Sequence, residues 1–491
     1  MNAPENLVLT AQQFASGQRH LLINGRWQAS QSGKTFDVFN PATGEVLARV
    51  AEGDKADVDL AVTAARAAFP KWAALPPAAR SSILWKIGDL IDQHAQELAT
   101  LESLDNGKPV GLALAVDIAL AAQTFRYYAG WCDKLEGATT QTNLPSMHAY
   151  TLREPLGVCA QIVPWNFPLL MASWKVAPCL ATGNVSILKP AEETPLTALR
   201  LGELMLEAGV PEGVIAIIPG YGHTAGAALS AHPGVDKVAF TGSTEVGKLI
   251  VQAASGNLKK VSLELGGKSP NIVFADADID AAIAGSANAI FFNSGQVCVA
   301  GSRLYAERKV FDRVLEGVSK VAQSIKVGAG LEPDSQMGPL VSTTQFDRVS
   351  GFLRVGHEEG AKVATGGHRV GERGYFIQPT VLVDVKESMR VVREEIFGPV
   401  LVAQPIDDIE SIARTANDTE YGLAASIWTR DLSKAHKMAA ALKAGTVWIN
   451  THGVLDTNMP FGGYKQSGWG REYGKESIEL YTQMKAVYAQ L

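Results

Sequence analysis

The feature of this 491-residue sequence that most constrains its fold is an alternation of short apolar runs with longer helical patterns. The runs are GVCAQIV (157–163), VSILK (185–189), VIAII (214–218), KVAF (237–240) and KVSLEL (260–265). Short apolar strands that alternate with helices indicate a parallel sheet covered by helices on both faces. The middle of the chain is therefore predicted to form an α/β layer structure.

The alternation restarts at about residue 263, with NIVF (271–274), a helix from Asp278 and further units up to GTVWIN (445–450). Two sheet-and-helix domains follow from this second series. Upstream, apolar residues at three- and four-residue steps predict one helix over 78–104, ended by DNGKP, and another over 112–128. The segment 131–150 and the tail after Gly468 fit neither domain.

Charge and cysteine content limit the classes of partner. Forty-four basic against 50 acidic residues give a net charge of −6, which argues against nucleic acid or an anionic membrane as partner. We expect no signal peptide in the first twenty residues and no apolar segment of the ~18 residues that span a bilayer. The cysteines, Cys132, Cys159, Cys179 and Cys298, form no zinc-type spacing, so no metal site is predicted. Few, scattered cysteines fit a reducing compartment, and we expect a cytoplasmic protein.

Two glycine-rich segments are candidate phosphate sites. PGYGHTAG (219–226) follows a strand-like run and matches a dinucleotide-binding turn, although a plain strand-to-helix turn is the alternative. FTGSTEVGK (240–248) nearly spells a P-loop, but Leu249 stands where that motif needs a hydroxyl, which argues against phosphoryl transfer. A helix that begins near Thr244 would still present free N–H groups to a phosphate, with the Ser243 hydroxyl as a further donor.

Three other segments hold residues with catalytic potential. Asn166 lies in PWNFP (164–168), where two prolines stiffen the turn, so its amide could donate to an oxyanion. Glu264 precedes paired glycines in LELGGKSP (263–270), and Cys298 ends GQVC (295–298). Each also has a structural alternative: a rigid core turn, a surface carboxylate at a strand end, or a small buried thiol.

Taken in order, seven motifs resemble the NAD(P)-dependent aldehyde dehydrogenase superfamily. They are PWNFP, KPAEETP, FTGSTEVG, LELGGKSP, GQVC, EEIFGPV and PFGGYKQSGWGRE, and they span about residues 155 to 475. The chain looks closest to the bacterial phenylacetaldehyde dehydrogenases of that superfamily. A non-catalytic relative that kept the fold is the alternative, and the intact Cys298, Glu264 and Asn166 argue against it.

The resemblance assigns catalytic roles. Cys298 would attack the aldehyde carbon as a thiolate, and Asn166 with the Cys298 N–H would hold the oxyanion. Glu264 would activate water to hydrolyse the thioester. Lys175 and Glu472 match positions that the family associates with a proton path.

The resemblance also implies NAD as the cofactor. Lys189 and Glu192 would hold the adenine-side ribose, and the Glu192 carboxylate would repel a 2′-phosphate, which favours NAD over NADP. The remaining cofactor contacts would be Gly242 and Ser243 at the pyrophosphate, Trp165 nearby, Glu395 on the nicotinamide ribose and Phe397 at the nicotinamide end. PGYGHTAG would then be a secondary turn near the adenine.

The implied fold is α/β, with two Rossmann-like parallel-sheet domains and a small β oligomerisation segment. The NAD-binding domain would comprise 1–130 and 151–262, the catalytic domain 263–467, and the oligomerisation segment 131–150 and 468–491. A homo-tetramer is expected, with a dimer as the alternative.

The expected substrate is an arylacetaldehyde such as phenylacetaldehyde, because the positions that would line the substrate tunnel are apolar or aromatic. The alternative is an aminoaldehyde or betaine aldehyde, held by cation–π contact with Trp174 and with Asp456 nearby. The predicted tunnel residues are Phe167, Leu170, Met171, Trp174, Phe292, Val297, Val299, Leu455 and Phe461.

Overall fold

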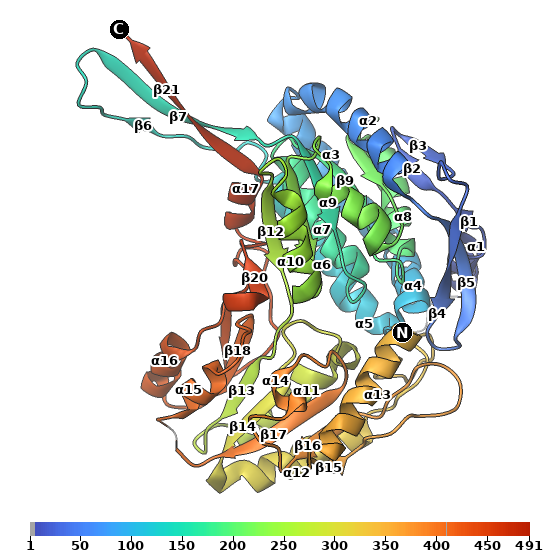
Figure 1. Cartoon of the computed structure of the whole chain (residues 1–491), viewed down its shortest axis with the longest axis vertical. Coiled ribbons are helices and arrows are strands. Elements are labelled where there is room, and N and C mark those ends of the chain that lie inside the picture. Colours follow the sequence, from blue (N-terminus) through green and yellow to red (C-terminus); the bar gives the residue numbers. More distant parts are fainter. Residues whose placement is uncertain (1–4, 409) are drawn as a thin grey trace.

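The computed structural model describes residues 5–408 and 410–491. Within these residues the strands form four sheets, one of eight strands, one of seven and two of three. The two large sheets lie in separate bodies, and a thin β arm projects from the first body with the C-terminus at its tip (Figure 1). The predicted α/β class with two parallel-sheet domains is confirmed.

The eight-stranded sheet has the order β20-β12-β11-β8-β9-β10-β2-β3. Its neighbours from β12 to β10 pair in parallel, whereas β20 at one edge and β2 and β3 at the other pair antiparallel. Every residue of β8, β9, β10 and β11 is buried, which explains why these strands read as continuous apolar runs. The strands span Leu21–Ile23 (β2), Arg26–Gln28 (β3), Val158–Ile162 (β8), Val185–Lys189 (β9), Ile215–Ile217 (β10), Lys237–Thr241 (β11), Lys260–Glu264 (β12) and Gly468–Trp469 (β20).

Helices from the first half of the chain surround this sheet, and α2, α7, α8 and α10 contact its strands (Figure 1). A small sheet of order β1-β5-β4 covers the N-terminal flank. The helices span Glu5–Ala15 (α1), Lys55–Ala73 (α2), Pro77–Gln93 (α3), Ala95–Asn106 (α4), Val110–Leu112 (α5), Ala113–Ile118 (η1, π-helical), Ala119–Ala129 (α6), Pro168–Ala181 (α7), Leu196–Ala208 (α8), Gly222–Gly226 (η2), Ala227–Ala231 (α9) and Thr244–Ala254 (α10). The small strands span Gln18–Arg19 (β1), Thr35–Asn40 (β4) and Glu45–Ala51 (β5).

The seven-stranded sheet of the second body has the order β15-β16-β17-β14-β13-β18-β19 and is parallel except at β15. Its strands span Pro270–Val273 (β13), Arg303–Glu307 (β14), Lys362–Thr365 (β15), Thr380–Val383 (β16), Val400–Ile406 (β17), Ala424–Trp428 (β18) and Thr446–Ile449 (β19). Its helices span Ile279–Phe291 (α11), Phe292–Gly295 (η3), Arg308–Ser324 (α12), Thr343–Glu358 (α13), Arg390–Arg393 (α14), Ile412–Asn417 (α15), Leu432–Ala441 (α16) and Lys465–Ser467 (η4).

The single helix predicted over 78–104 is wrong, because the chain breaks between α3 and α4 at His94. The φ and ψ of His94, −102° and 16°, lie outside helical values, and its Nδ1 lies 2.8 Å from Oε2 of Glu97. The predicted end at DNGKP is correct, because Gly107 takes a left-handed φ of 89° directly after α4.

The β arm consists of β6 (Thr139–Thr140), β7 (Met147–Pro155) and β21 (Thr482–Gln490). β21 pairs antiparallel with β7 along its whole length. The tail between Gly468 and the arm has a different place: β20 joins the eight-stranded sheet beside β12, and α17 (Glu476–Leu480) packs near α7.

One stretch, Val110–Ala129, passes the length and composition test for a membrane-spanning helix at a mean hydropathy of 1.2, which the sequence analysis did not expect. Phe125 and Tyr128 within it are fully buried, and it also carries the buried Asp117 and the charged Arg126. Its helices α5, η1 and α6 pack against α3, α4 and α7. We therefore interpret it as a core helix.

Candidate active site

The predicted site residues gather where parallel strands of the first sheet end. β8 ends at Ile162, just before Asn166; β11 ends at Thr241, just before Gly242 and Ser243; β12 ends at Glu264 itself. The carboxyl ends of neighbouring parallel strands share one edge of a sheet, where α/β proteins bind their ligands.

Asn166 is held in the turn between β8 and α7. Pro168 is the first residue of α7, where its missing N–H costs nothing and its fixed φ suits the helix. The Asn166 side chain is buried, and its Nδ2 donates a hydrogen bond of 2.9 Å to the backbone carbonyl of Gln296. Gln296 lies two residues before Cys298, so this bond joins the turn to the cysteine loop.

The cysteine loop has an unusual backbone. Asn293, Ser294 and Gly295 follow one another with φ values of 48°, 56° and 69°, a left-handed conformation that residues other than glycine rarely adopt. Asn293 Nδ2 donates to the carbonyl of Asn166 at 3.0 Å, and Ser294 Oγ donates to a backbone carbonyl at 2.8 Å. Such strained turns are typical of functional sites, and here the turn leaves Val297 and Cys298 half-buried between the buried Gln296 and Val299.

The paired glycines after Glu264 bring three segments together. A Cβ at Gly267 would lie 2.4 Å from the carbonyl oxygen of Cys298, and one at Gly266 would lie 2.3 Å from Oε2 of Glu395. At Gly267 the contact is with backbone, so only glycine permits this close approach, and at Gly266 a side chain would displace the Glu395 carboxyl group. The backbone that follows Glu264 therefore passes directly against Cys298 and Glu395.

Burial controls protonation at the centre of the site. Burial, together with the nearby carboxylates of Glu395 and Glu264, raises the pKa of the Cys298 thiol to about 12. Burial and the carboxylate of Glu472 hold the pKa of Glu264 well above its usual range, and Glu264 Oε2 has no hydrogen-bond partner among the described residues. The thiol of the half-buried Cys298 and a buried carboxyl group with an unpaired oxygen thus lie within electrostatic reach of each other.

A cavity of about 700 Å³ joins these groups. Cys298, Glu264 and Asn166 line it, as do all nine predicted tunnel residues: Phe167, Leu170, Met171, Trp174, Phe292, Val297, Val299, Leu455 and Phe461. Within this wall the rings of Phe167 and Phe292 stack at a centroid distance of 6.1 Å, and Trp174 packs edge-on against Phe461 at 5.3 Å.

The same cavity extends to the predicted cofactor residues. Trp165, Gly242, Ser243, Glu395 and Phe397 all line it. Ser243 caps α10, and its Oγ accepts from the N–H of Val246 at 3.3 Å, which leaves the first N–H groups of an 11-residue helix facing the cavity.

Glu395 lies between the two glycines and the cavity. Its Oε1 accepts from the N–H of Gly267 at 3.0 Å, and burial raises its pKa to about 7. Phe397 has a left-handed φ of 61°, and its ring meets that of Trp165 edge-on at 5.2 Å. These groups along one cavity fit the parts of a dinucleotide. The start of α10 suits the phosphates, the carboxyl group of Glu395 suits a ribose, and the two aromatic rings suit a ring of the ligand.

Four predicted residues lie outside the cavity lining. Lys189 and Glu192 form an ion pair of 2.8 Å at the end of β9, the neighbour of β8 in the sheet. Lys175 and Glu472 form a fully buried ion pair outside the cavity wall, and the charges of both influence the pKa of the Glu264 carboxyl group.

Sequence reasoning missed several lining residues, among them Val116 from η1, Leu120 from α6 and His452. Periodicity predicts the helix that carries Val116 and Leu120 but not which face meets the cavity. His452 follows a strand without any motif of its own; burial lowers its pKa to about 4, and its Nε2 lies 2.9 Å from the Val299 carbonyl.

The fold and the cavity together define an α/β enzyme. Its cavity contains both a site suited to a dinucleotide and the thiol of Cys298. Residues 27–487 match the model of the aldehyde dehydrogenase family. The mitochondrial aldehyde dehydrogenase of Leishmania tarentolae is 51% identical over 472 residues, which cover 96% of this chain and 95% of that protein. The chain belongs to the aldehyde dehydrogenase family.

Solved structures of aldehyde dehydrogenases have the same fold as this chain. The NAD+ complex of an aldehyde dehydrogenase from Bacillus cereus superposes with a TM-score of 0.98 at 47% identity, covering all of both chains. The indole-3-acetaldehyde dehydrogenase AldA of P. syringae, in complex with NAD+ and IAA, has a TM-score of 0.96 at 45% identity over 99% of both chains. The chain is thus an NAD-dependent enzyme that acts on small-molecule aldehydes.

Proposed function

We propose that the chain oxidises an arylacetaldehyde, such as phenylacetaldehyde, to the carboxylic acid with NAD+ as the hydride acceptor. The observation that carries the proposal is the aromatic and apolar cavity wall that faces the half-buried Cys298. A flat hydrocarbon ring gains from burial and from edge or stacked contacts with such a wall.

Cys298 is the proposed nucleophile. The thiol gives its proton to solvent, the sulfur of the thiolate bonds to the aldehyde carbon, and the carbonyl oxygen becomes the oxyanion of a thiohemiacetal. The free N–H of the Asn166 amide and the backbone N–H of Cys298 donate to that oxyanion. One N–H of the amide is already used on the Gln296 carbonyl, so the amide cannot rotate freely.

Oxidation and hydrolysis follow. NAD+, held by the cofactor residues described above, would supply the hydride acceptor, and loss of the hydride from the former aldehyde carbon would leave a thioester on Cys298. Glu264, once ionised, takes a proton from water, and the resulting hydroxide displaces the Cys298 sulfur to release the acid. The buried pair of Lys175 and Glu472 behind Glu264 is the proposed route by which this proton leaves.

One feature favours an aryl over a cationic aldehyde. Asp456, the carboxylate that would pair with a cation, is exposed, accepts from Asn458 and lies outside the cavity lining. An aminoaldehyde or betaine aldehyde is the second candidate, because Trp174 and Phe461 supply rings.

The test is a set of kcat/KM values for phenylacetaldehyde, benzaldehyde, an alkyl aldehyde and betaine aldehyde, followed by NADH absorbance. We expect phenylacetaldehyde to exceed betaine aldehyde by at least about tenfold, the difference of one well-placed apolar contact. A preference for betaine aldehyde would overturn the substrate assignment, and a lack of NADH with every aldehyde would overturn the function itself.

We further propose a cytoplasmic homo-tetramer. The four cysteines are all free, as in proteins of a reducing compartment. The β arm exposes Met484 and Tyr488 by 61% and 63%, and a partner subunit would cover such side chains. Light scattering of the full chain gives the subunit number, and a chain ended at Leu480 should lose the tetramer if the arm forms the interface.

A further inference from the structure

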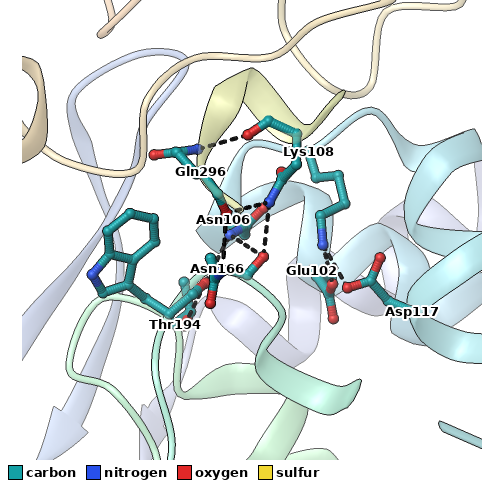
Figure 2. A network of polar contacts seen from close by, with 9 residues as sticks. Glu102, Asn106, Lys108, Asp117, Asn166, Thr194 and Gln296 are labelled. Carbon is teal, nitrogen blue, oxygen red and sulfur yellow. Dashed lines mark hydrogen bonds and ion pairs between the residues drawn. The ribbon is translucent and has the colours of Figure 1, made fainter. Parts of the chain in front are cut away.

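The end of helix α4 and the residues just after it contact three consecutive residues of the turn that carries Asn166. Figure 2 shows Asn106 beside Asn166. Asn106, the last residue of α4, reaches the carbonyls of Trp165 and Asn166. Two residues later, the Lys108 ammonium lies over the ring of Phe167. No motif in the sequence suggested a link between residues 106–108 and the turn.

The Asn106 amide is the main polar support of the turn. Its Nδ2 donates to the Trp165 carbonyl at 2.8 Å and approaches the Asn166 carbonyl at 3.5 Å, and its side chain is fully buried. Thr194 adds a longer hydrogen bond of 3.4 Å to the Trp165 carbonyl, and Asn293 donates to that of Asn166 at 3.0 Å. Because these peptide groups determine where the Asn166 side chain points, a change in their orientation would move the oxyanion donor.

A hydrogen bond to α8 and buried ion pairs hold the C-terminal end of helix α4 in place, and Asn106 with it. Asp105 Oδ2 accepts from the N–H of Leu196 at 3.1 Å, so the helix end is tied to α8. Lys108 donates to Glu102 at 2.9 Å and to Asp117 at 2.5 Å, and all three side chains are fully buried. Figure 2 shows this charged cluster beside the amide network of Asn106, Asn166 and Gln296.

We propose that Asn106 is a positioning residue for the oxidation: its amide, fixed at the end of α4, orients the turn that presents the Asn166 side chain to the substrate. The inference rests on the oxyanion role proposed above for Asn166. Asn106 is not among the described residues that line the cavity, so it acts only through the turn. Its removal should therefore lower the rate of oxidation without a comparable change in aldehyde KM.

The experiment is a double-mutant cycle on the full chain, with phenylacetaldehyde and saturating NAD+. Asn106→Ala should lower kcat/KM by about 10- to 100-fold, the effect of misplacing a reacting group by about 1 Å. Asn166→Ala should lower it by about 10²- to 10³-fold. The double variant should match Asn166→Ala to within about threefold, because a positioning residue has no effect once the group it positions is gone.

A matched control separates positioning from folding. Asn184 is also a fully buried amide, and its Nδ2 donates to Thr182 Oγ1 and to the Tyr481 carbonyl, both at 2.8 Å, outside the cavity lining. Asn184→Ala should lower the melting temperature yet leave kcat/KM within about threefold of the wild type. Asn106→Leu, which keeps the branching at Cγ but removes the amide, replaces Asn106→Ala if the latter does not fold.

The outcomes are distinguishable. An unchanged kcat/KM in Asn106→Ala, equal losses in both backgrounds, or failure of both Asn106 variants to fold would overturn the positioning role. A wild-type rate that Asn166→Ala leaves intact would instead overturn the role of Asn166, and a wild type inactive on every aldehyde would overturn the proposed function.

Discussion

The two sides of the cavity are held very differently. On the side of Cys298 and Asn166, buried amides bond to one another and to backbone carbonyls, and the left-handed turn at 293–295 is locked by these contacts. On the side of α10, Ser243, Glu245 and Lys248 are exposed, and among the described residues the Ser243 side chain makes only the hydrogen bond of a helix cap.

This difference separates two tasks. A reacting carbon must be held within a fraction of an ångström, and buried, mutually bonded groups provide that precision. A dinucleotide enters and leaves in every catalytic cycle, and an open helix start binds its phosphates through backbone N–H groups without a rigid wall. We call the two sides of the cavity the amide side, which holds Cys298 and Asn166, and the α10 side, which holds Ser243. Substitutions on the amide side should therefore reduce the rate of aldehyde oxidation strongly, whereas substitutions on the α10 side should have small effects on cofactor binding.

The largest effect is expected for Cys298→Ala, which removes the proposed nucleophile. We expect NADH formation from phenylacetaldehyde to fall on the order of 10⁴-fold or more, since loss of a nucleophile removes the covalent route entirely. Cys132→Ala is the matched control, because Cys132 is a buried free thiol outside the cavity lining. A similar loss in both variants would mean that the effect arises from folding.

Glu264→Gln tests the second reacting group. Acylation of Cys298 should continue while hydrolysis of the thioester slows by about 10²- to 10⁴-fold, the usual value of a general base. Rapid mixing should then show one NADH released per active site, followed by a slow steady state. A variant that lacks this burst would assign Glu264 to the first step rather than to hydrolysis.

Part of the chemistry on the side of the cavity that holds Cys298 and Asn166 could be predicted from the sequence. Seven ordered motifs pointed to Cys298, Glu264 and Asn166, and the apolar runs predicted the strands that bring these residues to one sheet edge. The contact of Asn106 with the turn that carries Asn166 could not be predicted from the sequence. The two residues are 60 positions apart, and the hydrogen bond between them depends on tertiary packing. The break at His94 was missed for a similar reason, since the apolar periodicity continues through it.

Between the two sides lies Glu395, whose pKa burial raises to about 7. Its carboxyl group is mostly neutral below that pH and mostly ionised above it, and an ionised carboxylate accepts the stronger hydrogen bonds from ribose hydroxyls. NAD+ affinity should therefore rise about tenfold between pH 6 and pH 8. Fluorescence titration measures this, and Glu395→Gln should show a flat profile; an equal slope in that variant would assign the titration to another group.

Glu192 tests the adenine end of the open side. Its carboxylate is about one-third exposed and already pairs with Lys189 at 2.8 Å, so its repulsion of a 2′-phosphate is partly screened. Glu192→Gln should lower the ratio of kcat/KM for NAD+ over NADP+ by about tenfold, mainly through a better KM for NADP+. An unchanged ratio would mean that another group selects the cofactor.

The smallest effect is expected for Ser243→Ala at the start of α10. The variant loses a side-chain cap on one N–H and a hydroxyl near the predicted phosphate, but the remaining backbone N–H groups of the first turn stay in place. The KM for NAD+ should rise only about two- to threefold, with kcat unchanged. Because the loss of one amide hydrogen bond at Asn106 is expected to cost at least about tenfold in rate, the two variants measured side by side compare the two walls directly. A loss in Ser243→Ala as large as that in Asn106→Ala would mean that the α10 side is as rigidly organised as the amide side, and that exposure does not distinguish them.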